Sequence, residues 1–166
     1  QKTTRFIKLC DTFNLPIVSL VDEPGFLIGP EAEKAGTILH GTNAVLATTE
    51  STVPWTTIMI RKSFGVAAAA HYGPDGYVLA WPSAESGPLP LEGGVAVAFK
   101  KEIAQSDDPE AKRKELEEKM AKNQSPFPRA EAFSVHEIID PRETRKYVAL
   151  WAERIQSQLK ASLMKR

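Results

Sequence analysis

Three short apolar runs, separated by stretches with helical spacing, constrain the fold of this chain more than any other feature. The runs are Ile17–Val21, Thr56–Ile60 and Tyr77–Trp81, and none of them alternates strictly between polar and apolar residues. Strands of this kind are typical of a parallel sheet that helices cover on both faces. The sequence therefore predicts an α/β fold with two βαβ units, whose crossovers should be right-handed.

Helical periodicity and helix-ending residues account for most of the remaining sequence. The predicted helices are residues 6–13, 31–51, 65–71, 95–105, 109–123 and 141–163, with a break at 125–128. Asp140 is the expected N-cap of the last helix, and Pro141 suits its first turn. We expect one partial domain over residues 1–166, in which residues 1–94 form the βα core with the site loops and residues 95–166 form a helical extension.

The last predicted helix carries an apolar stripe at intervals of four residues. Its members are Tyr147, Trp151, Ile155, Leu159 and Leu163. Such a stripe needs a surface to pack against. Core packing within the subunit and packing against another subunit are both compatible with this pattern.

Charge and cysteine content exclude several classes of function. The 21 acidic and 21 basic residues give a formal charge of zero, so no overall basic field attracts nucleic acid or an anionic membrane. Cys10 is the only cysteine, which leaves neither an intrachain disulfide nor a cysteine cluster for zinc. No apolar run reaches bilayer length, and residues 1–5 lack the apolar core of a signal peptide. We expect a reducing compartment, the cytoplasm or the mitochondrial matrix.

Three loops should meet at one edge of the predicted sheet. They comprise residues 22–30, 62–65 and 82–94, and each follows the carboxyl end of a predicted strand. In parallel sheets this edge is where ligands bind. Residues from distant parts of the sequence should therefore contribute to one site.

The middle loop leads into Gly65-Val66-Ala67-Ala68-Ala69, a run of mostly small residues. The first N–H groups of a helix have no intrahelical partner, so they can hold a developing negative charge. Small side chains let a ligand oxygen approach the backbone. This segment predicts an oxyanion hole, although tight packing of a helix on a sheet would produce the same composition.

Common catalytic motifs are absent from the sequence. It contains no Gly-x-Ser-x-Gly elbow, phosphate-binding loop, dinucleotide fingerprint or His-Glu-x-x-His zinc motif. His40, His71 and His136 are scattered, which favours structural roles for them. Asp22 and Glu23 at a strand end are interpreted as capping residues. Any chemistry should therefore depend on backbone amides.

Six segments, taken in order, resemble the carboxyltransferase subunits of biotin-dependent acyl-CoA carboxylases, such as propionyl-CoA and acetyl-CoA carboxylase β-subunits. One is Asp22-Glu23-Pro24-Gly25-Phe26, where that family has an Asp-x-Pro-Gly-Phe turn. The segments lie within residues 5–16, 21–29, 36–41, 50–54, 60–65 and 80–85. The resemblance covers most of the chain and maps onto the latter part of such a subunit.

This resemblance implies a crotonase-like (ClpP/crotonase) βαβ architecture, here a partial carboxy-terminal lobe with carboxy-terminal helices. In the family the amino-terminal lobe of a neighbouring subunit binds acyl-CoA, while this lobe receives carboxybiotin. The implied partners are that lobe or a complementary chain, and a biotin carboxylase or biotin carrier subunit, within a homo- or hetero-oligomer. No nucleic acid and no membrane span are implied.

The family's mechanism maps onto named residues of this sequence. Backbone amides of Val66 and Ala67 would stabilise the ureido oxyanion of biotin, which then removes the α-proton of the acyl thioester. No side-chain base and no metal is needed. The resemblance assigns further residues by position: biotin binding to Phe64, Gly65 and Ala68; acyl selection to Ala69; and site loops to Pro24, Gly25, Phe26, Gly93 and Gly94.

Two positions depart from the family pattern. Val66 stands where the family has glycine, so a side chain is added beside the expected oxyanion hole. Leu89-Pro90 replaces a Met-Gly pair, which removes one amide donor. These changes are expected in a branch with an acyl preference other than propionyl.

Three alternatives to a carboxylase component stay open. The first is a biotin-dependent decarboxylase subunit that runs the same chemistry in reverse. The second is a non-catalytic assembly module that keeps the fold without binding biotin. The third is a biotin-independent hydrolase or isomerase, which would need an acid or base such as His71 or Glu85.

Overall fold

A five-stranded sheet forms the centre of the computed structural model, which describes residues 1–164 except the side chains of residues 92, 162 and 163. The sheet order is β1-β2-β3-β5, β4 pairs with β2, and these pairings are all parallel. The strands are β1 (Ile17–Glu23), β2 (Trp55–Phe64), β3 (Tyr77–Ala80), β4 (Glu85–Gly87) and β5 (Glu137–Ile138). The predicted α/β class and the three predicted strands are confirmed. Strands β4 and β5 were missed because each is too short to show a period.

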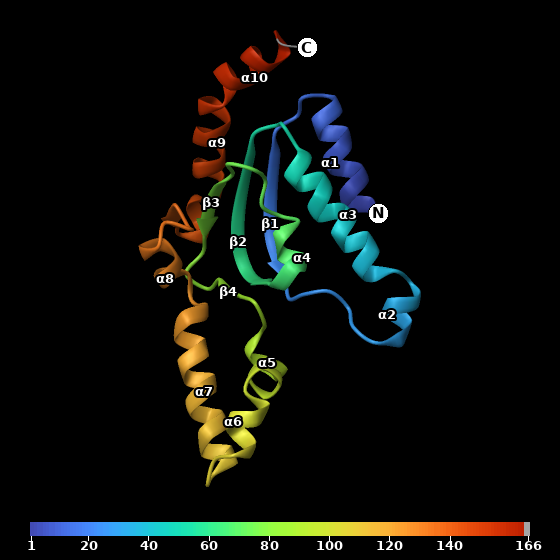
Figure 1. Cartoon of the computed structure of the whole chain (residues 1–166). Coiled ribbons are helices and arrows are strands. Elements are labelled where there is room, and N and C mark those ends of the chain that lie inside the picture. Colours follow the sequence, from blue (N-terminus) through green and yellow to red (C-terminus); the bar gives the residue numbers. More distant parts are fainter. Residues whose placement is uncertain (165–166) are drawn as a thin grey trace.

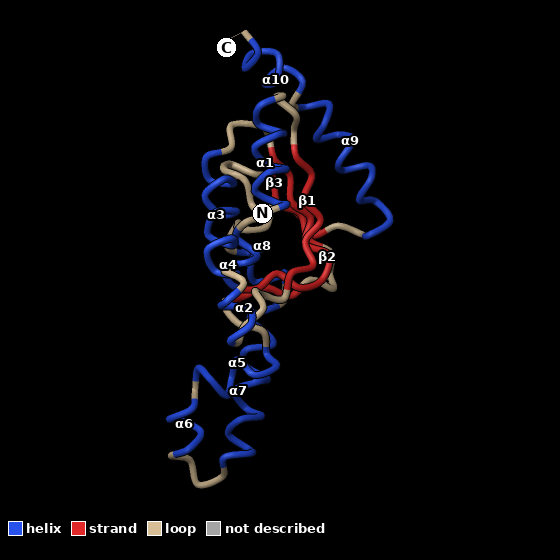
Figure 2. Tube along the Cα trace, turned by 90° about the vertical axis from the view of Figure 1, so that its right-hand side faces the viewer, coloured by secondary structure: helices blue, strands red, loops and turns tan. Residues whose placement is uncertain are grey.

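Helices cover both faces of the sheet, as the apolar runs predicted. One face packs against α1 (Lys2–Thr12), α3 (Thr37–Glu50), α4 (Gly65–Ala69) and α8 (Pro126–Glu131), and the other against α9 (Thr144–Arg154). Figure 2 shows α3 and α4 on one side of the strands and α9 on the other. Ile58 and Leu79 are fully buried between the sheet and α9, where Tyr147 and Val148 pack.

The single helix predicted over residues 31–51 is wrong, because the chain forms two helices there. Helix α2 (Pro30–Lys34) ends before Gly36, whose φ of +71° places it in the left-handed region, and α3 begins at Thr37. Glycine adopts that conformation without the penalty that a Cβ would bring. The resulting turn separates α2 from the long helix that packs on the sheet.

The helical extension also differs from its prediction. In place of one helix over residues 95–105 there are α5 (Leu91–Ala98) and α6 (Lys100–Ala104), which meet at Phe99. Helix α7 (Pro109–Gln124) begins after Asp108, whose carboxylate accepts hydrogen bonds from two amides of its first turn. The predicted break after the charged helix is confirmed, since α7 ends at Gln124 and Ser125 is extended, but it is shorter than 125–128 because α8 begins at Pro126. In Figure 1, α5, α6 and α7 extend away from the sheet.

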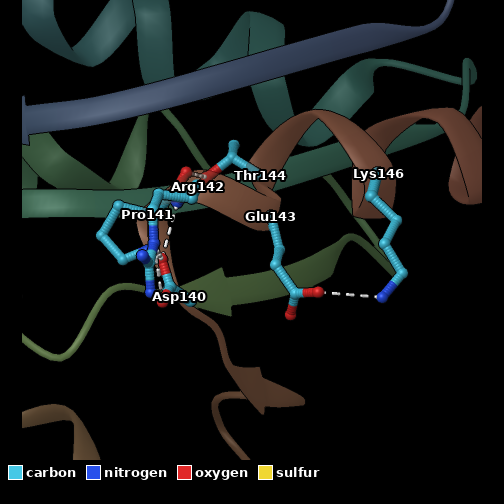
Figure 3. Close-up of polar contacts among 6 residues, drawn as sticks. All are labelled: Asp140, Pro141, Arg142, Glu143, Thr144 and Lys146. Carbon is cyan, nitrogen blue, oxygen red and sulfur yellow. Dashed lines mark hydrogen bonds and ion pairs between the residues drawn. The ribbon is translucent and has the colours of Figure 1, made fainter.

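The segment before α9 confirms that Asp140 is an N-cap and that Pro141 lies in the first turn. The carboxylate of Asp140 accepts a hydrogen bond from the Arg142 amide at 2.8 Å, and Pro141 opens a short 3₁₀ turn, η1 (Pro141–Glu143). Figure 3 shows this turn, together with the Glu143–Lys146 ion pair at 2.9 Å. The Trp81 indole donates to Thr144 Oγ1 at 2.9 Å, which ties the first residue of α9 to the end of β3.

The apolar stripe packs partly within the chain. Trp151 and Ile155 are buried, Tyr147 and Leu159 are partly buried, and the Leu163 side chain lies outside the described part of the structure. These residues continue from α9 into α10 (Gln156–Leu163). Core packing within the subunit is therefore supported for Tyr147, Trp151 and Ile155.

Strand β1 forms an edge of the sheet and leaves apolar residues in solvent. Val18 and Leu20 share the sheet face of Ile58, on which α9 packs, but they are exposed, and Phe6 and Leu9 of α1 are also exposed. A groove of about 590 Å³ lies between α1 and the first half of β1. Within residues 1–164, no helix combines the length and the apolar character needed to cross a bilayer.

Candidate functional site

Three connections leave the carboxyl ends of neighbouring parallel strands and meet at one edge of the sheet. Residues 24–29 follow β1, α4 follows β2 and residues 82–94 follow β3; residues 22–23 and 62–64, which were predicted as loop, belong to β1 and β2. Strand β4 adds a further link, because Lys62–Phe64 at the end of β2 pair with Glu85–Gly87. The predicted convergence of these segments is confirmed. Residues 82–94 are not one loop, however, since they contain β4 and the first turns of α5.

The turn from β2 into α4 requires glycine at its first helical position. Gly65 has a φ of +63°, and a Cβ there would lie 3.4 Å from the Pro88 carbonyl oxygen. A larger residue would be strained in its backbone, and its Cβ would be in van der Waals contact with the neighbouring loop. The predicted turn therefore lies directly beside the segment that follows β4.

The second and third residues of α4, Val66 and Ala67, carry the N–H groups that were predicted to form an oxyanion hole. N–H groups in a first helical turn have no partner within the helix. The Val66 side chain is 63% exposed and the Ala67 methyl is 3% exposed. The extra side chain at Val66 thus lies in solvent and not in the core, while the Ala67 methyl is buried in the core.

The other predicted site residues in this turn divide into buried and exposed positions. Phe64 is 1% exposed, so its ring belongs to the core and only its backbone faces the turn. Ala68 is also buried, whereas Gly65 and Ala69 are exposed. A ligand at this turn would contact backbone and small side chains, with no aromatic ring from Phe64.

The residues predicted to form the flanking site loops mainly contact other residues of this chain. Gly25 has a φ of +130° and donates its N–H to Glu23 at 3.1 Å. The Phe26 ring covers Gly41 of α3 so closely that no Cβ fits at that glycine. Gly93 is exposed with a φ of +86°, and Gly94 is buried beside Leu89, with both glycines inside α5. Pro24 is exposed.

Of the two residues predicted to cap the following loop, Glu23 does so by accepting the Gly25 amide, whereas Asp22 contacts β2 instead. The Asp22 carboxylate accepts hydrogen bonds from Arg61 Nε at 3.1 Å and from the Lys62 amide at 3.1 Å. The Arg61 hydrogen bond and the Lys62 amide lower the pKa of Asp22. These contacts join the carboxyl ends of β1 and β2, which fixes where the loops begin.

Each histidine has a hydrogen-bond partner within the chain. His71 Nδ1 lies 3.1 Å from Ser19 Oγ, His40 Nε2 lies 3.0 Å from Gln1 Nε2, and His136 Nδ1 accepts the Val78 amide at 3.0 Å. Burial lowers the pKa of the half-buried His71 imidazole from its ordinary value of 6.5, and the Glu23 carboxylate partly opposes that shift. The structural interpretation of the histidines is supported.

The depressed pKa of His71 predicts a loss of stability on acidification. Below pH 6.5 the imidazole binds a proton more readily in the unfolded chain than in the folded one, so the free energy of unfolding should fall as pH decreases. In a His71→Asn variant this part of the pH dependence should disappear between pH 7 and 5. Chemical denaturation of both proteins across that range measures it. Identical slopes would contradict the prediction.

Comparison with known proteins gives consistent matches over nearly the whole chain. The family model described as the carboxyl transferase domain matches residues 1–166. The methylmalonyl-CoA carboxyltransferase 12S subunit of Propionibacterium freudenreichii subsp. shermanii is 41% identical over 153 residues, or 90% of this chain and 29% of that protein. The methylmalonyl-CoA decarboxylase subunit alpha of Propionigenium modestum is 38% identical over 153 residues, covering 89% of this chain and 29% of that protein.

Solved structures agree with these matches. Transcarboxylase 12S, solved as a hexamer assembly with methylmalonyl-coenzyme A and methylmalonic acid bound, has a TM-score of 0.86 at 40% identity and covers 94% of this chain and 31% of its own. The beta subunit of Pseudomonas aeruginosa geranyl-CoA carboxylase has a TM-score of 0.84 at 23% identity, with coverages of 96% and 32%, and supports the fold alone. The chain spans a little under a third of these relatives.

Proposed function

This chain belongs to the carboxyl transferase domain family, and from that premise we propose that it forms the biotin-side lobe of a carboxyltransferase in a biotin-dependent acyl-CoA carboxylase. The expected crotonase-like fold of a partial lobe is confirmed by its likeness to carboxyltransferase structures. The observation that carries the proposal is the turn from β2 into α4, where the amides of Val66 and Ala67 begin a helix at the ligand-binding edge of a parallel sheet.

The residues present fit a planar ureido ring. Gly65 and Ala69 are exposed and small, and the Val66 side chain extends into solvent, so backbone N–H groups can be approached directly. Carboxybiotin, when bound, supplies the carboxyl group that is transferred. We assign to the amides of Val66 and Ala67 the donation of hydrogen bonds to the ureido oxygen as negative charge develops on it.

Other residues of the chain keep these donors in place. Gly65 permits the left-handed turn, the Phe64 ring fixes the end of β2 in the core, and the Asp22–Arg61 contact joins β1 to β2. Pro90, which replaces a glycine of the family pattern, precedes α5 and accepts the Gly94 amide at 3.2 Å through its carbonyl. In our proposal the amides of α4 therefore act without a donor from that loop.

Acyl-CoA would be bound by the complementary lobe of another chain, and biotin would arrive on a carrier protein or domain, supplied by a biotin carboxylase subunit. The open edge of β1 and the exposed Val18 and Leu20 favour such association, because an unpaired strand edge with apolar neighbours is a surface that other chains can cover. Ala69, exposed at the end of α4, is the proposed acyl-selecting residue.

A second direction of reaction has specific support. A relative that is 38% identical over 89% of this chain is a methylmalonyl-CoA decarboxylase subunit alpha. The same two amides would stabilise charge on the ureido oxygen in either direction, since the forward and reverse reactions share a transition state. A biotin-dependent decarboxylase subunit is therefore our alternative proposal.

The proposal is tested by the reverse reaction. The complete carboxyltransferase that contains this chain would be incubated with malonyl-CoA and methylmalonyl-CoA, with and without free biotin or biocytin. We expect loss of carboxylate that depends on the added biotin, and the faster substrate would reveal the acyl preference. Decarboxylation that ignores biotin, or none at all from a folded complete assembly, would overturn the proposed function in favour of the biotin-independent enzyme or the assembly module.

A further inference from the structure

Three hydroxyl groups from three different elements hold the carboxyl end of α4. Thr48 Oγ1 of α3 donates to the Ala70 carbonyl at 2.9 Å, and Thr57 Oγ1 of β2 donates to the His71 carbonyl at 2.7 Å. Ser19 Oγ of β1 lies 3.1 Å from His71 Nδ1. All three residues are buried. We call Ser19, Thr48 and Thr57 the α4 clamp.

Helix α4 has few other means of holding its orientation. It contains five residues, and a helix this short is not stable through its own hydrogen bonds. Val66 and Ala69 are exposed, so side-chain packing comes only from the small methyl groups of Ala67 and Ala68. The orientation of the helix therefore depends on what holds its two ends. Its start continues from β2, and its end is held by the clamp.

The geometry points to Thr57 and Thr48 as positioning residues for the Val66 and Ala67 amides. This inference rests on the proposed function, in which those amides hold the ureido oxygen. Helix α4 lies against β1 and β2 in Figure 1, so its tilt relative to the sheet sets where the amides point. Misplacing a reacting group by about 1 Å can cost about 10²-fold in rate, because an oxyanion donor acts only at its proper distance.

Thr57 offers the sharper test of the two threonines. Thr48 Oγ1 also lies 3.0 Å from the Ala44 carbonyl of its own helix, so its removal would disturb α3 as well. Thr57 is fully buried, and its hydroxyl donates to the His71 carbonyl. Replacing it with valine keeps the shape of the side chain and removes the donor.

The neighbouring residue provides a matched control. Thr56 is also fully buried in β2, and its hydroxyl donates to the Tyr77 carbonyl of β3 at 2.9 Å. When changed to valine, Thr56 and Thr57 each lose one hydrogen bond from a buried hydroxyl to a backbone carbonyl. Consecutive strand residues point to opposite faces of the sheet. Only Thr57 contacts the α4 side.

The experiment compares Thr57→Val, Thr57→Ser and Thr56→Val in the complete carboxyltransferase, using biotin-dependent decarboxylation of methylmalonyl-CoA. We expect Thr57→Val to lower kcat by about 10- to 100-fold with KM for the thioester unchanged. The two valine variants should show similar losses in Tm. Thr57→Ser, which keeps a hydroxyl, should recover most of the rate, and Thr56→Val should keep the wild-type rate.

Two outcomes separate this inference from the proposed function. Equal kcat values for Thr57→Val and Thr56→Val, beside an active biotin-dependent wild type, would overturn the positioning role and leave the proposed function standing. Absence of biotin-dependent activity in the wild type would overturn both. Amide NMR supplies a readout that does not depend on activity: Thr57→Val should shift the Val66 and Ala67 resonances, whereas Thr56→Val should not, and equal shifts would contradict the inference.

Discussion

Replacing Ala67 with proline should reduce biotin-dependent carboxyl transfer by about 10² to 10³-fold, the usual cost of losing one oxyanion donor. Proline lacks the N–H group, and Ala67 is the third residue of α4, where that group has no intrahelical partner to lose. Transfer rates measured with free biotin and methylmalonyl-CoA would show the effect mainly in kcat.

A matched Ala67→Gly variant separates the amide from the side chain. Glycine keeps the N–H group and removes one buried methyl, so it should lose far less activity than proline does. Circular dichroism and Tm must show that the proline variant is folded, because the Ala67 side chain is only 3% exposed. Near-wild-type turnover by a folded Ala67→Pro enzyme would remove Ala67 from the proposed oxyanion hole.

Truncating Phe64 to alanine should destabilise the protein by about 3–5 kcal/mol, the usual loss when a large aromatic side chain is removed from a core. Phe64 is 1% exposed, and it stands immediately before α4. The cavity would lie beside Gly87 of β4, against which the ring packs. Thermal or denaturant unfolding, followed by circular dichroism, measures the loss.

Phe64→Leu serves as the comparison for this prediction. Leucine fills much of the same apolar volume, so its loss of stability should be clearly smaller than that of alanine. If the ring instead served biotin directly, Phe64→Ala would weaken biotin binding with little change in unfolding. That result would contradict the buried position of the ring.

The central strands and the convergence of the site segments were predictable because they depend on local patterns. Continuous apolar runs identify buried parallel strands, and parallel strands place their carboxyl ends at one edge. The helix predicted over residues 31–51 failed at Gly36, whose left-handed turn overrides an otherwise helical pattern. Strands β4 and β5 have only three and two residues, which is too few for any periodicity.

The residues of the α4 clamp were not predicted as functional. Ser19 and Thr57 interrupt apolar strand runs with hydroxyl groups, and this is the one signal that the sequence offers for them. A buried hydroxyl needs a hydrogen-bond partner, but its identity depends on which segment packs above it. Phe64 shows the same limit, since an aromatic residue before a glycine turn can face either a ligand or the core.

The amino-acid sequence by itself determined the parallel α/β class, the glycine turn into α4 and the position of the small residues along it, because period and backbone preference are local properties. Only the tertiary structure decided that Phe64 lies in the core, that Phe26 covers Gly41 and that Thr48 and Thr57 reach the carboxyl end of α4. Those contacts join residues far apart in the chain. Close packing of sheet and helices selects among the many pairs that the same local patterns would allow.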